Sequence, residues 1–266
     1  MTGSSRAMSP VPPILVTGAT NFRELRDMRA LDGRSVRPGA LLRSDRLCEL
    51  SARDWRILGE LPLVTICDLR SAAERRRHPN TVPATLRVCS LEFETDHDLG
   101  VNRSLIELLS RDPTPAGAVR VMVGLYRRFP TEMAPALRAI VACLIAGGSP
   151  MLIHCTAGKD RTGFVVGALL RALEIAPAAV EADYLMSRGW SGARRYRAAL
   201  WRRLAPDIPA AQLQPILDAV LDVRRAYLRA AFSIISAQFG SFGRYLQTGV
   251  GISGADVAQL REVMLQ

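Results

Sequence analysis

Residues Leu152 to Gly163 read Leu-Ile-His-Cys-Thr-Ala-Gly-Lys-Asp-Arg-Thr-Gly, and this stretch decides the fold of the chain. An apolar run, Met151 to Ile153, stops at His154 and Cys155. A second apolar run, Phe164 to Leu170, follows the stretch without a break. The pattern predicts a buried strand, a short loop and a buried helix, in that order.

The predicted loop holds a cysteine between a strand end and a helix N-terminus. There, unpaired backbone N–H groups and the helix dipole make the local field positive, which favours the thiolate form of Cys155. The same amides can bind a phosphate dianion. Arg161 adds a planar guanidinium for two phosphate oxygens, and Thr162 places a hydroxyl near the sulfur. The loop therefore combines a nucleophile with an oxyanion cradle.

The Cys-x5-Arg-Thr spacing resembles the phosphate loop of the cysteine-dependent phosphatases. The full motif, from His154 to Gly163, is similar to that of the bacterial atypical tyrosine and phosphoinositide phosphatases. Further segments, from about Ile14 to the C-terminus, resemble the same family: Asn21-Phe22-Arg23-Glu24, Leu42-Arg43-Ser44-Asp45, Cys67-Asp68-Leu69-Arg70-Ser71 with Glu74, Tyr126-Arg127-Arg128-Phe129-Pro130, Ala182-Asp183-Tyr184-Leu185 and residues 240–246.

Strands alternate with helices up to Ile175, which indicates an α/β domain. With the resemblance, we expect a cysteine-phosphatase-like sheet, mostly parallel and flanked by helices, in a single domain over residues 13–266. The resemblance also implies a helical C-terminal lid at about residues 206–239. The helical pattern of residues 209–238 is expected to break near Pro215. Residues 1–12 lack the apolar core of a secretory signal and are predicted to be a disordered lead-in.

Local signals place two further features. Ser51 is a good N-cap for a helix that runs through Glu60. Ligands of parallel sheets bind at the carboxyl ends of the strands, so three strand ends are expected at one edge: residues 68–70, residues 93–98 and Cys155.

We expect phosphomonoester hydrolysis in two steps, in which Cys155 attacks phosphorus and forms a phosphocysteine. Arg161 and the loop amides would stabilise the equatorial oxygens of the transition state. His154 is expected to hold the cysteine loop rather than to act as a base. The resemblance implies that Lys159 binds extra phosphates of phosphoinositides, and a solvated lysine is the alternative. The predicted substrate-binding residues are Thr156, Ala157, Gly158, Lys159, Thr162, His154 and Asp96.

The general acid has more than one candidate. The chain has no Trp-Pro-Asp loop, because Pro206-Asp207 is not preceded by tryptophan. The resemblance implies that Asp160 is the acid, and its alternative role is to hydrogen-bond the loop and keep its shape. Asp96 or Asp98 is the second candidate, since their loop is expected near the site. Asp68 is predicted to be a structural carboxylate tied to loop amides or to an arginine. Four other polar residues either line the pocket or hold the fold together: Asn21, Arg23, Arg43 and Arg70.

Composition narrows the kinds of partner. The net charge of +10, from 35 Lys and Arg against 25 Asp and Glu, favours anionic ligands, although a GC-rich genome is an equal explanation. The basic residues are not interleaved with aromatics in a strip, so nucleic-acid binding is not expected. The chain has no Cys-x-x-Cys pair, and we expect neither a metal nor a cofactor. No apolar run is long enough to span a membrane.

The sequence therefore predicts a cysteine-dependent phosphatase. Its expected substrates are phosphotyrosine, phosphoserine or phosphothreonine, and phosphoinositides. The expected partners are phosphorylated proteins or phosphoinositides, with peripheral contact to an anionic membrane, and the protein is expected to be a monomer. Its expected location is the cytoplasm, or the outside of the cell after export without a classical signal peptide. The alternatives are a catalytically silent module that binds phospho-ligands, and a rhodanese or arsenate reductase, which lacks support because no resolving cysteine lies nearby.

Overall fold

The computed structural model describes residues 16–85, 89–92, 103–206 and 208–266. The predicted lead-in and the loop with Asp96 and Asp98 lie outside the described residues. No helix in the described ranges is both long enough and apolar enough to cross a membrane. The helices are α1 (Ala52–Glu60), α2 (Ala72–Arg77), α3 (Arg103–Arg111), α4 (Pro115–Glu132), α5 (Ala134–Ile145), α6 (Arg161–Ala172), α7 (Pro177–Leu185), α8 (Ala193–Leu204), α9 (Ala210–Leu221), α10 (Arg225–Phe239), α11 (Phe242–Arg244), the π-helix η1 (Tyr245–Val250) and α12 (Gly254–Met264).

One sheet of mostly parallel strands forms the centre of the molecule, as predicted. Its order is β1 (Arg23–Glu24), β2 (Leu41–Ser44), β5 (Met151–His154), β3 (Thr65–Asp68) and β4 (Cys89–Glu92). Neighbouring strands are parallel except for β1, which runs antiparallel to β2. The strand before Cys155 is therefore the middle one, with two strands on either side.

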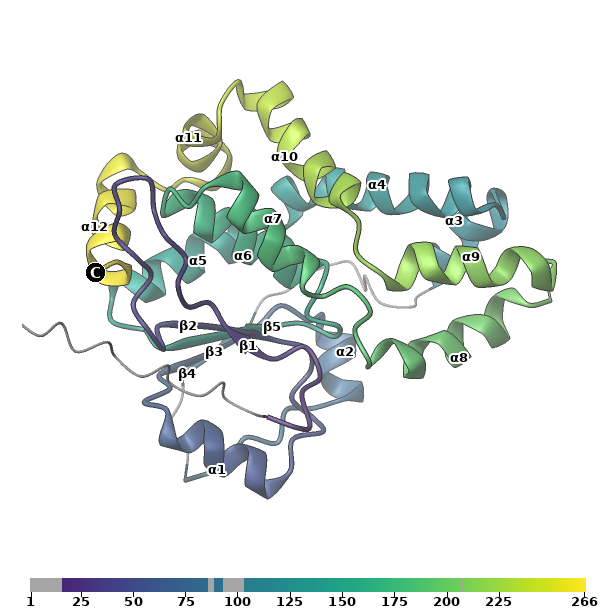
Figure 1. The fold of residues 1–266 in the computed structure, drawn as a ribbon, viewed down its shortest axis with the longest axis horizontal. Helices are drawn as coiled ribbons and strands as arrows, with labels where there is room; N and C mark the ends of the chain where they lie inside the picture. The colour runs from purple at the N-terminus through teal and green to yellow at the C-terminus, as the bar shows by residue number, and fades with distance from the viewer. Residues whose placement is uncertain (1–15, 86–88, 93–102, 207) are drawn as a thin grey trace, which may run out of the picture.

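Helices cover both faces of this sheet. Figure 1 shows α1 on one side and α4 to α7 on the other. Along β5, Leu152 belongs to the smaller core cluster, whereas Met151 and Ile153 belong to the larger one. The smaller cluster joins the sheet to α1 through Leu42, Ile66, Leu152, Trp55 and Leu58. Because both faces are buried, these strands read as continuous apolar runs.

Among the helices whose first residues the structure describes, three begin at capping boxes. In each, a serine side chain accepts a bond from the backbone N–H three residues on, and the acid at that position accepts one from the serine N–H: Ser51 with Asp54, Ser71 with Glu74, and Ser253 with Asp256. Such reciprocal bonds satisfy two of the N–H groups left open at a helix start. The predicted helix from Ser51 through Glu60 is confirmed as α1.

The predicted helix break near Pro215 is wrong in position. Pro215 lies inside α9, at an exposed position. The helical stretch instead breaks at Asp222, whose backbone is extended and whose Oδ1 accepts a hydrogen bond from Gly189 N at 3.1 Å. A proline removes one hydrogen bond from a helix, and the burial of Leu213 and Leu217 offsets that loss.

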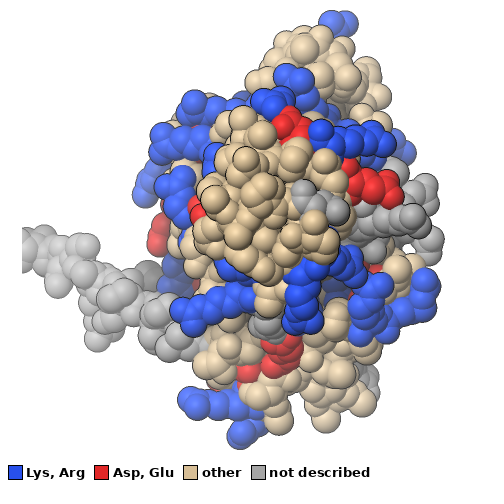
Figure 2. All heavy atoms as spheres, turned by 90° about the vertical axis from the view of Figure 1, so that its right-hand side faces the viewer, with Lys and Arg blue, Asp and Glu red and all other residues tan. Residues whose placement is uncertain are grey.

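Helices α3, α8 and α9 extend beyond the sheet at one end, on the right of Figure 1. Figure 2 looks onto this end of the molecule. Lys and Arg side chains surround a central area of uncharged side chains there, and acidic side chains are fewer. This end therefore presents a basic face.

Candidate active site

Cys155 directly follows the central strand β5 and is buried. The adjacent strands β2 and β3 end in register with it, because Ser44 and Asp68 both pair with His154. The predicted meeting of residues 68–70 with Cys155 at one sheet edge is confirmed, whereas residues 93–98 lie outside the described part of the chain. The phosphate loop, defined here as residues 155–161, thus lies where parallel sheets bind ligands.

The carbonyl groups of the phosphate loop are held from outside. Thr156 O accepts from Arg46 N at 3.3 Å, and Ala157 O accepts from Asn21 Nδ2 at 2.9 Å. Gly158 O accepts from Arg43 Nη2 at 2.7 Å. In a trans peptide the next N–H points opposite to the carbonyl. The N–H groups of residues 157, 158 and 159 therefore point away from these partners.

Gly158 is required by two features of the loop. Its φ of +66° lies in the left-handed region, which side-chain-bearing residues rarely adopt. A Cβ atom at this position would lie 2.3 Å from Ser44 O. The loop therefore approaches the end of β2 more closely than any side chain would allow.

Arg161 is the first residue of α6, and its buried side chain is fixed by α2. Its Nη1 lies 2.6 Å from Glu74 Oε2, and its Nη2 lies 2.7 Å from Glu74 Oε1. Thr156 Oγ1 also donates to Glu74. Because Glu74 belongs to a capping box with Ser71, the guanidinium has one orientation beside the loop.

Glu74 and Arg161 each stabilise the charged form of the other. Burial alone raises the pKa of Glu74, but the charge and hydrogen bonds of Arg161 outweigh it and bring the pKa down to about 2. Burial likewise works to lower the pKa of Arg161, and Glu74 more than offsets that effect, so the pKa of Arg161 lies above its ordinary value. Both groups are therefore charged at neutral pH.

Asp160 lies at the pocket with both carboxylate oxygens engaged. Lys159 Nζ is 2.8 Å from Oδ1 and 2.7 Å from Oδ2. Tyr126 of α4 donates its hydroxyl to Oδ1 at 2.7 Å. Lys159 is itself buried and also donates to Val220 O of α9 at 3.0 Å. The alternative of a solvated lysine at position 159 is therefore wrong.

His154 lies behind the loop and is fully buried. Its Nδ1 is 3.3 Å from Cys155 O, and its Nε2 is 3.1 Å from Asn80 Nδ2. Burial is the main reason that the pKa of His154 falls to about 4, against the opposing charge of Asp68. The neutral ring therefore donates from Nδ1 to the cysteine carbonyl and accepts from Asn80. This geometry agrees with the predicted role of holding the cysteine loop.

A hollow that is partly open to solvent adjoins the loop. Its polar floor is formed by Cys155, Thr156, Ala157, Lys159, Asp160 and Arg161. Its walls come from α3, α4, α8, α9 and the segment before α8: Leu105, Met122, Leu125, Trp190, Tyr196, Leu200, Val220 and Leu221. Of the predicted substrate-binding residues, Thr156, Ala157 and Lys159 thus face the hollow. Gly158 and His154 support the loop, and Asp96 lies outside the described residues.

The range predicted from the resemblance to be a lid, residues 206–239, contains α9 and α10. Helix α9 contributes Val220 and Leu221, but α8 also lines the hollow and lies before residue 206. Helix α10, inside the predicted range, packs on α4 and α7. Movement of these helices stays a prediction.

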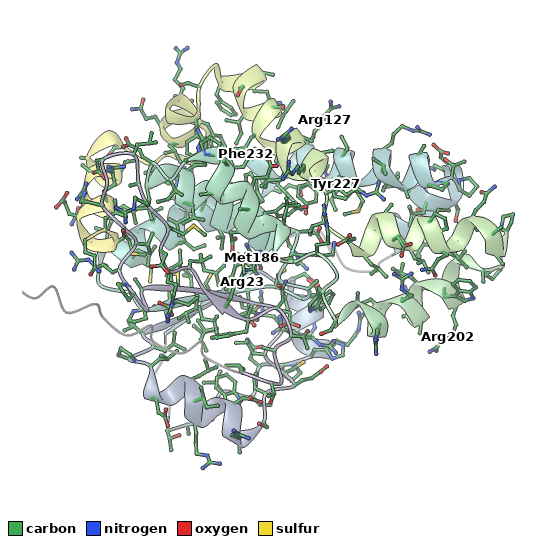
Figure 3. All side chains as sticks on the ribbon, in the orientation of Figure 1. Arg23, Arg127, Met186, Arg202, Tyr227 and Phe232 are labelled. Carbon is green, nitrogen blue, oxygen red and sulfur yellow. The ribbon has the colours of Figure 1, made fainter. Side chains whose placement is uncertain are left out.

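The sequence left two roles open for Asn21, Arg23, Arg43 and Arg70: to line the pocket or to hold the fold together. Their contacts support the second role. Arg70 binds Asp68, with Nη2 2.7 Å from Oδ2, which confirms Asp68 as a structural carboxylate. Arg23 Nε lies 2.8 Å from Asp183 Oδ1, and Arg43 pairs with the other oxygen of Asp183. Figure 3 shows Arg23 at the sheet, beneath the helices. Asn21 and Arg43 then extend this network to the loop carbonyls.

Sequence reasoning missed the roles of Glu74 and Tyr126. The spacing Ser71-x-x-Glu74 signals a helix start, but it does not say that the same carboxylate holds Arg161. Tyr126 looks like an ordinary core aromatic, and it does pack on Phe129, Tyr184 and Tyr227. Only the arrangement of α4 over the loop brings its hydroxyl to Asp160.

The described residues contain no group of three or more His, Cys, Asp or Glu side chains placed to hold a metal ion.

Comparison with known proteins identifies relatives over almost the whole chain. The chain is 36% identical over 274 residues to the triple specificity protein phosphatase PtpB of Mycobacterium tuberculosis, covering 93% of this chain and 97% of the relative. It is 34% identical over 251 residues to a protein of Cupriavidus necator with a provisional name as a tyrosine-protein phosphatase, covering 91% of this chain and 84% of the relative. A profile of the tyrosine phosphatase family matches residues 14–266. A phosphate loop on a mostly parallel sheet, and similarity along the full domain, place this chain in the tyrosine phosphatase family.

Proposed function

We propose that this phosphatase hydrolyses phosphotyrosine through a phosphocysteine formed on Cys155. The observation that carries the proposal is that Cys155 and Arg161 line one hollow, and that Asn21 and Arg43 hold the carbonyl groups of the loop between them. Helix α6 begins there without a side-chain cap, so its first N–H groups are available to an anion. The apolar walls suit the aromatic ring of phosphotyrosine.

In the first step the sulfur of Cys155 attacks phosphorus, and the bond to the leaving oxygen breaks. Arg161 and the loop amides bind the equatorial oxygens, where negative charge is concentrated in the transition state. In the second step water attacks the phosphocysteine, the P–S bond breaks and inorganic phosphate leaves. Thr162 is buried, and its hydroxyl has no hydrogen-bond partner among the described residues. That hydroxyl can donate to the sulfur as it departs.

Asp160 is our candidate for the acid that protonates the leaving oxygen. Among the described residues that line the hollow, Asp160 is the only one with a carboxylate. Lys159 holds it as an ion pair in the absence of substrate. A phosphate dianion in the loop competes for the same ammonium, so the released Asp160 carboxylate can take up a proton from water and pass it to the leaving oxygen. Asp96 and Asp98 remain the alternative, and Asp160 would then serve only to shape the loop.

Phosphoserine, phosphothreonine and phosphoinositides are further proposed substrates. The name of the mycobacterial relative, a triple specificity phosphatase, supports activity on more than one class. Lys159, which lines the hollow together with Arg161, supplies a second cation for a second phosphate group that displaces Asp160 from it. The protein is proposed to act as a monomer, which light scattering after gel filtration tests directly.

The decisive experiment compares wild type with Cys155→Ser on para-nitrophenyl phosphate, a phosphotyrosine peptide and phosphoinositides. We expect turnover by wild type and no turnover by the variant. Vanadate should inhibit the wild-type enzyme competitively. Turnover retained by Cys155→Ser excludes the covalent scheme, and a wild type that binds phosphate without turnover would leave the silent binding module. Asp160→Asn should lose more rate on poor leaving groups than on activated aryl phosphates, and equal losses would assign Asp160 a structural role.

A further inference from the structure

Helix α8 has two sides of different chemistry. On its inner side, Tyr196 and Leu200 line the hollow next to the phosphate loop. On its outer side, Arg194, Trp201 and Arg202 are exposed. Figure 3 shows Arg202 projecting from α8, on the side away from α9. We propose that this outer side, named here the α8 face, docks onto an anionic lipid surface.

The α8 face is continuous along the helix. At 3.6 residues per turn, five exposed residues fall on one side of α8: Arg194, Ala198, Trp201, Arg202 and Ala205. The alanines on this side carry only a methyl group each, so the long side chains on it are two arginines and a tryptophan. Trp201 is one of the few large hydrophobic side chains exposed in the described ranges, with 37% of its surface accessible. A tryptophan beside arginines is typical of a helix that lies at a membrane interface.

The charge of α8 is strongly one-sided. Its sequence, Ala-Arg-Arg-Tyr-Arg-Ala-Ala-Leu-Trp-Arg-Arg-Leu, contains five arginines and no acid. Arg197 pairs with Asp218 of α9 at 2.7 Å, and Arg194 and Arg202 are exposed on the α8 face. The same end of the molecule presents a basic face in Figure 2. Anionic lipid headgroups supply the complementary charge.

The shape of this region favours a lipid surface over an acidic peptide. Peptides bind in grooves or along sheet edges, where several sides of the chain are contacted. Helix α8 instead extends from the body of the molecule beside α9 (Figure 1), so its outer side is convex. A helix that lies at the edge of the molecule in this way can contact a plane along its whole length.

Docking through the α8 face would bring the hollow to the membrane. A helix with its side chains is about 10 Å across, so the headgroups would lie roughly that far from the wall formed by Tyr196 and Leu200. This inference goes beyond the proposed hydrolysis, because it concerns where the enzyme binds and not which bond it cleaves. It is therefore tested with lipids that the enzyme does not hydrolyse.

The test is sedimentation of the full chain with two kinds of vesicle, phosphatidylcholine alone and phosphatidylcholine with about one fifth phosphatidylserine. Neither contains a phosphoinositide. We expect wild type to bind only the anionic vesicles. Each arginine near such a surface contributes about a fivefold factor, so the Arg194→Gln/Arg202→Gln variant should bind roughly 30-fold more weakly. Trp201 fluorescence, isolated by comparison with Trp201→Phe, should be quenched by brominated lipid.

The matched control is Arg53→Gln/Arg56→Gln, which removes the same charge from two exposed positions on α1. Turnover of para-nitrophenyl phosphate should stay unchanged in both double variants, which shows that they are folded. Equal weakening by the two variants would reduce the effect to net charge and overturn the proposal. So would the failure of wild type to bind anionic vesicles, and binding to polyglutamate instead would assign the α8 face to an acidic protein. A chain that binds vesicles but lacks phosphatase activity would contradict the proposed function and leave the docking intact.

Discussion

The hydroxyl of Tyr126 lies 2.7 Å from Asp160 Oδ1, and 2.8 Å from the hydroxyl of Tyr184. A phenol has one hydrogen to donate, so Tyr126 donates its hydrogen bond to Asp160 and accepts one from the hydroxyl of Tyr184. Burial, followed by the charge of Asp160, raises the pKa of Tyr126 well above its ordinary value, which keeps the phenol protonated. Helices α4 and α7 thus fix the direction of the candidate acid.

Tyr126→Phe is expected to lower kcat on a poor leaving group such as phenyl phosphate about tenfold, with little change in KM. The missing hydrogen bond to a charged group lets the carboxylate leave its position. Activated aryl phosphates, which need no acid, should be affected much less. Tyr245→Phe is the matched control, because Tyr245 is also buried and donates to Pro130 O at 2.9 Å, away from the site. Equal losses on both leaving groups would mean that Tyr126 only packs.

Glu74→Gln should remove the charge that holds Arg161. A buried guanidinium without its partner costs about 3 kcal/mol of stability, measured as the free energy of unfolding in urea. We expect kcat/KM to fall at least tenfold, and bound phosphate to restore part of the lost stability, since it supplies the missing negative charge. Asp256→Asn, which weakens a capping box alone on α12, is the control and should leave activity unchanged. Wild-type activity in Glu74→Gln would show that α2 does not orient the guanidinium.

Gly158→Ala is expected to abolish turnover of para-nitrophenyl phosphate. The new methyl group would meet Ser44 O at 2.3 Å, on a backbone with φ of +66°. The loop must then shift, and its amides no longer converge on one anion. Gly124→Ala provides the contrast, because Gly124 lies inside α4 and the added carbon meets no atom within 4 Å beyond the nearby backbone of its own helix. That variant should stay active and gain up to about 1 kcal/mol of stability, and an active Gly158→Ala would contradict the close approach.

Stability should fall as the pH drops from 6.5 to 4.5, because of His154. The folded pKa of about 4 lies below the ordinary 6.5, so the unfolded chain binds a proton that the buried ring does not. The stability that comes from keeping the His154 ring neutral is fully present above pH 6.5 and is lost progressively below it. The loss amounts to about 2 kcal/mol between pH 6.5 and 4.5. The carboxylate of Glu74, with a pKa of about 2, contributes little there. Urea unfolding of His154→Asn should show a shallower dependence on pH, and an unchanged slope would locate the titrating group elsewhere.

Lys159 is the single lysine of the chain, so amine reagents report on it directly. Its ammonium is buried and bound to Asp160 and Val220 O. Reductive methylation of Lys159, followed by mass spectrometry, should be at least about tenfold slower than that of the N-terminal amine. Asp160→Asn removes the ion pair and should speed the reaction at Lys159 several-fold. An equal rate in both proteins would mean that the pair does not hold the ammonium.

The elements that carry the site were predictable from local signals. The apolar run before Cys155 predicts the central strand, and the Ser51 cap predicts α1. The phosphate loop could also be predicted from the sequence, because its residue types and spacings suit the binding of an oxyanion. The break in the helical stretch after α8 was misplaced, since Pro215 is tolerated where neighbours are buried and Asp222 is fixed by Gly189, a partner distant in sequence.

The sequence by itself determined the nucleophile, the phosphate loop and the α/β class, because these depend on short-range patterns of residue type. Only the tertiary structure decided which side chains hold that loop in its working shape. Glu74 reaches Arg161 from α2, Tyr126 reaches Asp160 from α4, and Arg43 reaches Gly158 from β2. Each contact joins residues at least 34 positions apart. Such pairs are set by how the helices pack on the sheet, and no local preference of either residue encodes that packing.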